Sequence, residues 1–225
     1  MHILAIDTSG DSCSAALLFG SELQQRLEIQ PRRHGELVLG MMEGLLAAAG
    51  MTLTQLDALA FGRGPGSFTG VRIATAVVQG AAFGADLPVV PVSTLAALAQ
   101  GNFRSQGGTR VLAAFDARMG ELYWGPYLLG DGGLMRSAGE EEVGSPELVV
   151  LPEDGSWSGI GSGWSTHGDV LRRRLGSRVR SVVPDAGCES RDIAVLAAAE
   201  YAAGRYVAAE HALPVYLRDR VTSVP

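Results

Sequence analysis

The stretch His2-Ile-Leu-Ala-Ile-Asp-Thr-Ser-Gly-Asp-Ser-Cys-Ser-Ala-Ala-Leu-Leu-Phe19 decides the fold. An apolar strand over residues 2–7 ends in Asp7 and a run of turn-forming residues, and a second strand covers residues 14–19. Polar and apolar residues then alternate over residues 22–30, as in a half-exposed third strand. The chain therefore opens with three antiparallel strands joined by tight turns.

Helical and strand patterns alternate over the rest of the first half. Apolar residues recur at helical spacing between Pro31 and Gly50, and small and apolar residues dominate the segment after Ser67. The expected elements are a helix over 34–49, a strand over 58–61, a helix over 67–84, a strand over 88–92 and a helix from 93 or 94. This order predicts an α/β fold built on a ribonuclease-H-like lobe of the actin, sugar-kinase and Hsp70 (ASKHA) architecture.

The second half reads as a reduced copy of the first. A composition break at residues 101–108 predicts an N-terminal lobe over 1–105 and a reduced C-terminal lobe over 106–225. Strands flanking Asp116 repeat the opening strand, aspartate and turn. The expected elements are strands over 111–115, 121–128 and 179–183, helices over 166–175 and 190–206, and an irregular segment over 129–155 in which Glu140-Glu141-Glu142 is a solvated acidic stretch.

Composition indicates a cytoplasmic protein without a membrane segment. The 225 residues are 47% hydrophobic, but no apolar run reaches the roughly 18 residues that cross a bilayer, and the N-terminus lacks a signal-peptide pattern. Cys13 and Cys188 are far apart and predict two free thiols. All 18 basic residues are arginines, yet the net charge is −6, so any nucleic acid should be bound only through a partner.

Two turns are candidate sites for a nucleotide or phosphate. The loop from Gly62 to Arg72 offers flexible glycines, Gly64 and Gly66 among them, and Ser67 as the N-cap of a helix. Phosphate binding and tight packing against a neighbour are both open for this loop. Asp7-Thr8-Ser9 presents a carboxylate and hydroxyls of the kind that orient a magnesium-bound water, although these are also ordinary turn residues.

Two helices of the first half are candidates for a partner interface. Their candidate residues are Leu37, Met41 and Leu45 on the first helix, and Gly70, Ala74 and Val77 on the second. The apolar spacing of one helix and the small residues of the other allow close helix packing, which predicts a four-helix contact with another chain. Burial of both helices within their own domain is the alternative.

No residue pattern predicts a metal centre or a catalytic group. The histidines His2, His34, His167 and His211 include no pair at helical ligand spacing. No serine, histidine and aspartate or cysteine and histidine arrangement is convincing. We therefore expect no catalytic residue, no metal ligand and no tightly bound cofactor in this chain.

Four segments together resemble the TsaB (YeaZ) family of tRNA threonylcarbamoyladenosine biosynthesis proteins, which is related to TsaD and its glycoprotease-like fold. They are Ile3–Ser9, Gly64–Arg72, Pro91–Leu95 and Pro214–Arg218. The resemblance implies a non-catalytic partner of a TsaD-containing complex that forms the threonylcarbamoyl group on adenosine 37 of tRNAs reading codons that begin with A. It also implies a TsaD heterodimer, work with the ATPase TsaE, a homodimer when alone, and ATP/ADP and Mg used by the complex.

The resemblance also bears on catalysis. TsaD binds metal through a His-x-x-x-His pair, and Thr94 and Leu98 stand at the matching positions here. Neither side chain replaces an imidazole as a ligand pair. The alternatives are an independent ATP-dependent phosphotransferase of the ASKHA class and a metallopeptidase, the latter opposed by the missing ligands.

Overall fold

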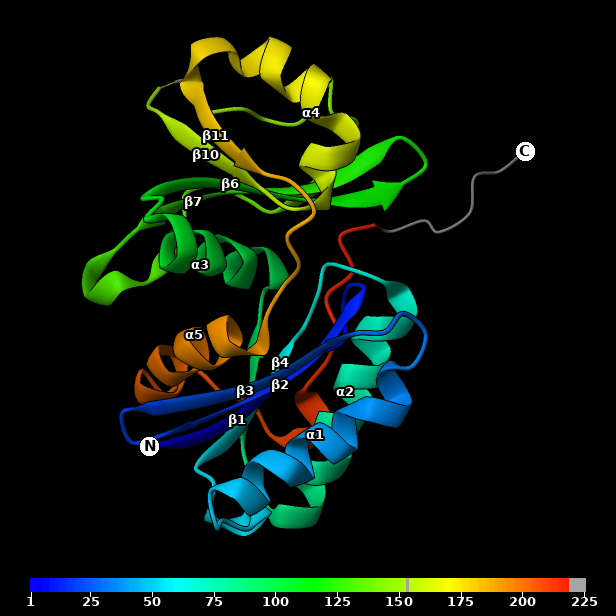
Figure 1. Ribbon diagram of the computed structural model, residues 1–225, viewed down its shortest axis with the longest axis vertical. Helices are drawn as coiled ribbons and strands as arrows, with labels where there is room; N and C mark the ends of the chain where they lie inside the picture. The colour runs from blue at the N-terminus through cyan, green and yellow to red at the C-terminus, as the bar shows by residue number, and fades with distance from the viewer. Residues whose placement is uncertain (153, 219–225) are drawn as a thin grey trace.

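The computed structural model describes residues 1–152 and 154–218 and contains two β-sheets (Figure 1). The first sheet has the strand order β3-β2-β1-β4-β5, in which β1, β2 and β3 are antiparallel and β1, β4 and β5 are parallel. Its strands are β1 (His2–Asp7), β2 (Ser12–Phe19), β3 (Glu22–Ile29), β4 (Ala58–Gly62) and β5 (Val89–Val92). The predicted opening of three antiparallel strands is confirmed.

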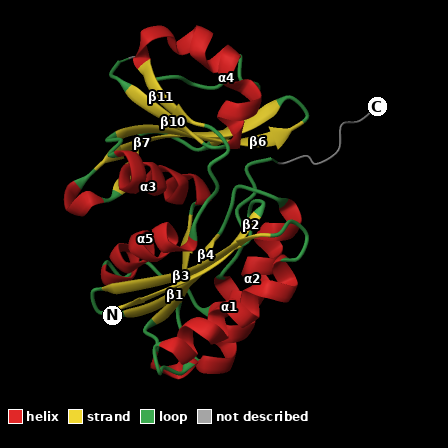
Figure 2. Ribbon diagram, viewed as in Figure 1, coloured by secondary structure: helices red, strands yellow, loops and turns green. Residues whose placement is uncertain are grey.

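Helices cover both faces of the first sheet (Figure 2). The helices α1 (His34–Ala48) and α2 (Phe68–Ala85) lie on one face, close to the predicted ranges. On β1, Leu4 and Ile6 face these helices because side chains alternate along a strand, whereas Ile3 and Ala5 face the opposite side. That opposite side is covered by α5 (Ser190–Ala202), which comes from the far end of the chain.

The second sheet has the strand order β11-β10-β6-β7-β8, with β9 paired to β7. Its strands are β6 (Arg110–Arg118), β7 (Glu121–Leu129), β8 (Met135–Ser137), β9 (Glu142–Gly144), β10 (Trp157–Ile160) and β11 (Val179–Val183). The helix α4 (Ser162–Leu175) packs on one face of this sheet and α3 (Thr94–Gln106) on the other. Four short 3-10 helices complete the described elements: Leu53–Gln55, Asp131–Gly133, Gly176–Arg178 and Ala209–His211.

Three expectations for the second half were wrong. Residues 129–155 contain β8 and β9, and β10 was not predicted because Trp157–Ile160 is short and lies among polar residues. The helix α4 begins four residues before the expected position. The helix α5 follows β11 in the chain, as expected, but it ends at Ala202 instead of Tyr206, and its buried residues pack on the first sheet.

The two sheets are joined through α3 and α5, which pack against each other between them (Figure 1). Arg104 of α3 donates two hydrogen bonds of 2.9 Å to the buried carboxylate of Asp192 on α5. This guanidinium opposes the effect of burial on the pKa of Asp192, which nevertheless lies above its ordinary value. The predicted division at residues 105 and 106 stays a prediction, and α5 crosses it.

The segment after α5 returns along the first sheet and then reaches the second. Val207 pairs with Val89 at the edge of β5, and Ala209 and Ala212 lie in the core under α2. Further on, Arg218 contacts Glu121 at the start of β7. Within residues 1–152 and 154–218, no helix has the length and apolar character needed to span a membrane.

Candidate functional site

The turn after β1 is closed and hydrogen-bonded internally. Asp7, Thr8 and Ser9 are all buried, with Asp7 and Thr8 fully out of contact with solvent. The Thr8 hydroxyl donates to the carbonyl of Gly70 at 2.6 Å, and the Ser9 amide and hydroxyl donate to Oδ2 of Asp7 at 3.2 and 3.0 Å. The Ser9 hydroxyl therefore bonds within the turn, and the Thr8 hydroxyl ties the turn to α2.

The glycine-rich loop and the start of α2 press against this turn. A Cβ atom at Gly62 would lie 2.2 Å from Oδ1 of Asp7, and one at Gly66 would lie 2.7 Å from the carbonyl oxygen of Ser9. A Cβ at Gly70 would lie 1.9 Å from the carbonyl oxygen of Thr8. Glycine at these positions lets two backbones approach closely. Of the two readings left open for the loop, these contacts favour tight packing.

The other loop residues lie at the same junction. Ser67 is the N-cap of α2, as predicted, since its hydroxyl accepts from the amide of Gly70 at 3.4 Å, while its own amide donates to the carbonyl of Ser9 at 2.8 Å. Gly64, at φ +99°, accepts from the amide of Thr94 at 3.1 Å. The structure thus brings Asp7, Thr8 and Ser9 together with this loop, a contact between the two candidate turns that the sequence did not predict.

Asp7 is an unusual carboxylate because no cation compensates its burial. Burial raises its pKa to about 7, and hydrogen bonds from Ser9 and from the Cys188 thiol oppose this rise. Its Oδ1 atom has no hydrogen-bond partner. Both cysteines are free, as predicted, and both are buried. Cys188 lies against Asp7, and burial raises the pKa of its thiol well above the ordinary value.

The matching turn in the second sheet is more open. Asp116 Oδ1 accepts from the amide of Arg118 at 2.9 Å, and the Arg118 guanidinium lies 3.3 Å from Oδ2. The amide of Asp116 donates to the Ser162 hydroxyl at the start of α4. His167 of α4 lies 3.9 Å from Asp116, a neighbour that the sequence did not reveal because no local motif links these positions.

The acidic stretch between β8 and β9 is not simply solvated, so that expectation was wrong. Oε1 of Glu141 accepts hydrogen bonds of 2.5 Å from the hydroxyls of Ser93 and Tyr127. Ser93 follows β5 of the first sheet and Tyr127 belongs to β7 of the second, so Glu141 links the two sheets. Glu142 accepts from the amide of Val150 at 2.7 Å. These carboxylates have hydrogen-bond partners because the fold brings distant residues to them, which the composition of the segment does not reveal.

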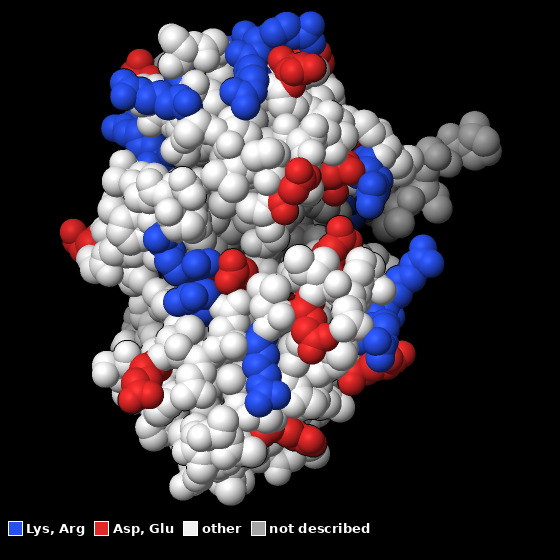
Figure 3. Space-filling view, in the orientation of Figure 1, with Lys and Arg blue, Asp and Glu red and all other residues white. Residues whose placement is uncertain are grey.

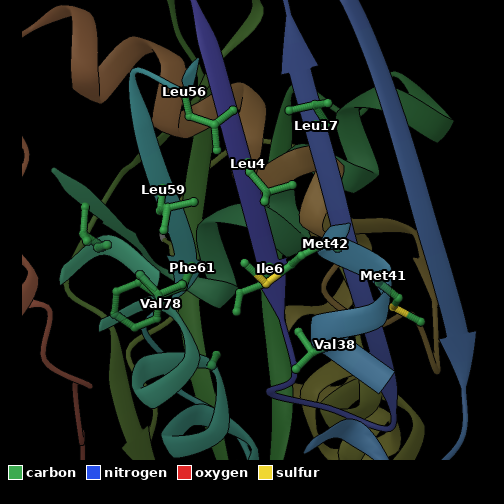
Figure 4. Close-up of a cluster of buried hydrophobic side chains, with 14 of the residues drawn as sticks. Leu4, Ile6, Leu17, Val38, Met41, Met42, Leu56, Leu59, Phe61 and Val78 are labelled. Atoms are coloured by element: carbon green, nitrogen blue, oxygen red, sulfur yellow. The ribbon is translucent and has the colours of Figure 1, made fainter. Parts of the chain in front are cut away.

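The predicted partner-facing residues largely face the protein's own core. Met41, Leu45 and Ala74 are at most 4% exposed, and Gly70 is buried against Thr8. Leu37 and Val77 are partly buried and pack on the same cluster. Figure 4 shows the Met42 side chain reaching Ile6 of the first sheet, and Sδ of Met41 lies 3.9 Å from Sγ of Cys13 on β2. These contacts agree with the alternative stated above, burial of both helices within their own domain, and the partner role of these residues stays a prediction.

Thr94 and Leu98 are both committed to the fold. Thr94 is fully buried, and its hydroxyl donates to the carbonyl of Pro65. Leu98 is 1% exposed and packs in the cluster between α3 and the second sheet. In the part of the chain that the structure describes, no three His, Cys, Asp or Glu residues are grouped so that they could hold a metal ion.

Comparison with known proteins connects this structure to one family. A family model described as TsaD, tRNA N6-adenosine threonylcarbamoyltransferase, matches residues 27–160. A TsaB protein of Escherichia coli (strain K12), named a tRNA threonylcarbamoyladenosine biosynthesis protein, is 44% identical over 98% of this chain and 96% of its own. A TsaB of Haemophilus influenzae is 40% identical over 99% of this chain and 95% of its own.

A solved structure agrees with these relatives. YeaZ from Pseudomonas aeruginosa superposes with a TM-score of 0.91 and 46% sequence identity, over 96% of this chain and 99% of that one. Both the sequence and the arrangement of the two sheets are therefore similar to these proteins along nearly the whole chain. On this evidence the chain belongs to the TsaB (YeaZ) family.

Proposed function

We propose that this protein acts in tRNA threonylcarbamoyladenosine biosynthesis as a non-catalytic partner of TsaD, supporting formation of the threonylcarbamoyl group on adenosine 37 of tRNAs that read codons beginning with A. The observation that carries the proposal is the similarity to proteins named TsaB over almost the entire chain. The match to a family model named for TsaD agrees with descent from the same fold as the catalytic partner.

The chemistry of Thr94 and Leu98 supports an accessory role. A metal-binding pair needs two side chains with free donor atoms, and histidine is the usual choice. Leu98 has no donor atom, and the Thr94 hydroxyl already donates to Pro65. A metal centre on α3 would therefore need ligands in place of both Thr94 and Leu98, and it would lose the hydrogen bond from Thr94 to the loop at Pro65.

We also propose that the chain consists of two ribonuclease-H-like lobes of the ASKHA architecture, the second reduced, with the division at residues 105 and 106. The two sheets share one plan that supports this proposal. In each, an antiparallel pair (β1 with β2, β6 with β7) continues through two parallel strands (β4 and β5, β10 and β11). The C-terminal lobe then also supplies α5 to the first sheet.

The outer faces of α1 and α2 are the proposed partner surface, in place of the buried stripes. Leu39 is 51% exposed on α1, and Phe83 is 82% exposed on α2. Ala76 and Gly80 are also exposed on α2, and a Cβ at Gly80 would meet nothing within 4 Å. Small residues flanked by exposed apolar side chains allow a helix of another chain to approach closely.

The same surface is proposed for the TsaD heterodimer and for a homodimer of the free chain, with TsaE and ATP/ADP and Mg joining at the level of the complex. We place the protein in the cytoplasm and expect tRNA contact only through the complex. Figure 3 shows arginine and acidic side chains interspersed on one face, and the net charge of −6 opposes independent binding of a polyanion.

The test is binding of purified TsaD to the wild-type chain and to Ala76→Arg, measured by sedimentation and calorimetry. We expect wild type to form a heterodimer and Ala76→Arg to lose at least about tenfold in affinity while remaining folded, because position 76 is exposed. Arg173→Glu on α4 is the control and should bind normally. Failure of the wild type to bind TsaD would contradict the proposed function, whereas normal binding by Ala76→Arg would contradict only the surface.

A further inference from the structure

The first turn of α2 and the C-terminal segment form a compact cluster of an arginine and two aromatic rings. The guanidinium carbon of Arg72 lies 3.7 Å from the centroid of the Phe68 ring and 5.7 Å from that of Tyr216. The two ring centroids are 5.6 Å apart, and Nε of Arg72 donates to the Tyr216 hydroxyl at 2.9 Å. We call Phe68, Arg72 and Tyr216 the Arg72 cluster.

The cluster is held in place from both sides. Phe68 and Arg72 lie four residues apart on α2, so they share a face of the helix. Tyr216 is positioned by its neighbour Val215, whose amide donates to the carbonyl of Arg63 at 2.8 Å. An arginine side chain normally loses considerable rotamer freedom when it binds a partner. Here that freedom is already restricted before any partner arrives.

Arg72 differs in its bonding from the arginines that pair with carboxylates. Arg104, Arg136 and Arg218 each pair with a carboxylate. Arg72 is exposed and forms no ion pair with any carboxylate in residues 1–152 and 154–218. Because Phe68 covers the guanidinium plane and Tyr216 takes the Nε–H, the terminal Nη groups remain for a new partner.

The surroundings favour an anionic group on a protein surface. Phe68 and Tyr216 are 46% and 45% exposed, and partly exposed tyrosine and arginine side chains are typical anchors of protein interfaces. The N-terminus of an α-helix carries partial positive charge, which adds to that of Arg72. A planar carboxylate matches the fork of guanidinium N–H groups.

We propose that the Arg72 cluster is a preformed docking site for a carboxylate side chain of a protein partner. The inference rests on the proposed function, because it takes TsaD as that partner. The contact would lie at the N-terminal end of the outer face of α2. A phosphate of tRNA is the less favoured occupant, because the chain carries a net charge of −6.

The experiment measures the affinity of purified TsaD for three variants by calorimetry at two salt concentrations. Arg72→Glu should lose about 100-fold, since it places like charges together at the contact. Tyr216→Phe keeps the ring but removes the hydroxyl that orients Arg72, and should lose roughly threefold to tenfold. Arg173→Glu, an exposed arginine on α4, is the matched control and should change affinity less than twofold.

A charge-reversal screen identifies the carboxylate. Each Asp and Glu of TsaD is changed to Arg and tested against Arg72→Glu, and one change should restore most of the lost affinity. The inference is overturned if folded Arg72→Glu binds TsaD like wild type, or if no reversed carboxylate restores binding. It is also overturned if Arg72→Glu impairs only tRNA retention by the assembled complex, which would indicate a phosphate contact. Absence of TsaD binding by the wild type would instead refute the proposed function.

Discussion

The turns after β1 and β6 have the same place in their sheets but opposite environments. Asp7 has no exposed surface, an unpartnered Oδ1 atom and a pKa raised to about 7 by burial. The Asp116 side chain is 16% exposed and is bonded by the amide and guanidinium of Arg118. One turn belongs to the interior and the other to the surface.

The glycines at the following helix explain this difference. In the first sheet, Gly66 and Gly70 seat α2 on Ser9 and Thr8, which come after Asp7, so the helix covers the carboxylate. In the second sheet, Gly161 and Gly163 seat α4 against Ala114, two residues before Asp116. The helix therefore leaves the second aspartate uncovered. The position at which the helix contacts the strand thus decides whether the aspartate of the turn is accessible to a ligand.

The largest expected effect breaks the close contact in the first turn. Gly70→Ala places a Cβ 1.9 Å from the backbone oxygen of Thr8, and this backbone has little room to move because Thr8 is buried. Overpacking a core typically costs about 1–3 kcal/mol, and we expect a loss at or above the upper end of this range. Chemical denaturation of the isolated chain measures it.

Gly80→Ala is the matched control on the same helix. A Cβ at Gly80 meets nothing within 4 Å, so the substitution should stabilise the chain by up to about 1 kcal/mol through helix propensity. Equal stability of Gly70→Ala and wild type would show that α2 does not seat on the turn as described, and the comparison between the two sheets would fail.

A smaller effect concerns the charge of Asp7. Its pKa is about 7 in the folded chain against an ordinary 3.8, so between these values the folded chain holds a proton that the unfolded chain has lost. The free energy of unfolding therefore falls as pH rises from about 4 to about 7, and the loss is complete above that range. Three pKa units set an upper limit of about 4 kcal/mol.

Asp7→Asn removes this penalty. We expect the variant to be more stable than wild type by about 2 kcal/mol at pH 8, less than the limit because a buried amide also lacks a partner, and to be nearly equal near pH 4. Thermal unfolding across this pH range measures the difference. Asp192→Asn should destabilise instead, since it leaves Arg104 without its carboxylate. A variant Asp7→Asn with the same stability profile as wild type would mean that Asp7 is not desolvated.

Local patterns were enough to predict most of the first sheet and both of its outer helices, because each element there carries its own periodicity. Which sheet α5 covers could not be predicted from local patterns. Its apolar face fits either sheet, and only the chain path from β11 decides which one it covers. Short strands such as β8 and β9 have too few residues to show a period of two.

The residues of the candidate site were also predictable only where a local pattern marks them. The turn residues at Asp7 and the glycine loop were each named as candidates, and they lie together because the ends of parallel strands meet at one edge of the sheet. The sequence left open whether Met41 and Ala74 are buried, because an apolar stripe has the same sequence pattern whether it covers a sheet or a partner. Glu141 and Cys188 were missed because their partners are distant in sequence.

The smallest expected effect tests the surface character of the second turn. In Asp116→Asn the side-chain oxygen still accepts from the Arg118 amide, so the turn keeps its hydrogen bond, and only the ion pair is lost. The Arg118 side chain is 86% exposed, and exposed ion pairs contribute about 0–1 kcal/mol. We expect a change in unfolding free energy below about 0.5 kcal/mol at pH 7, measured by urea denaturation beside Asp7→Asn. A loss of 2 kcal/mol or more would show that the contact of Asp116 with His167 and the start of α4 holds this turn together as firmly as the first, because solvent screening leaves an exposed pair too weak to account for it.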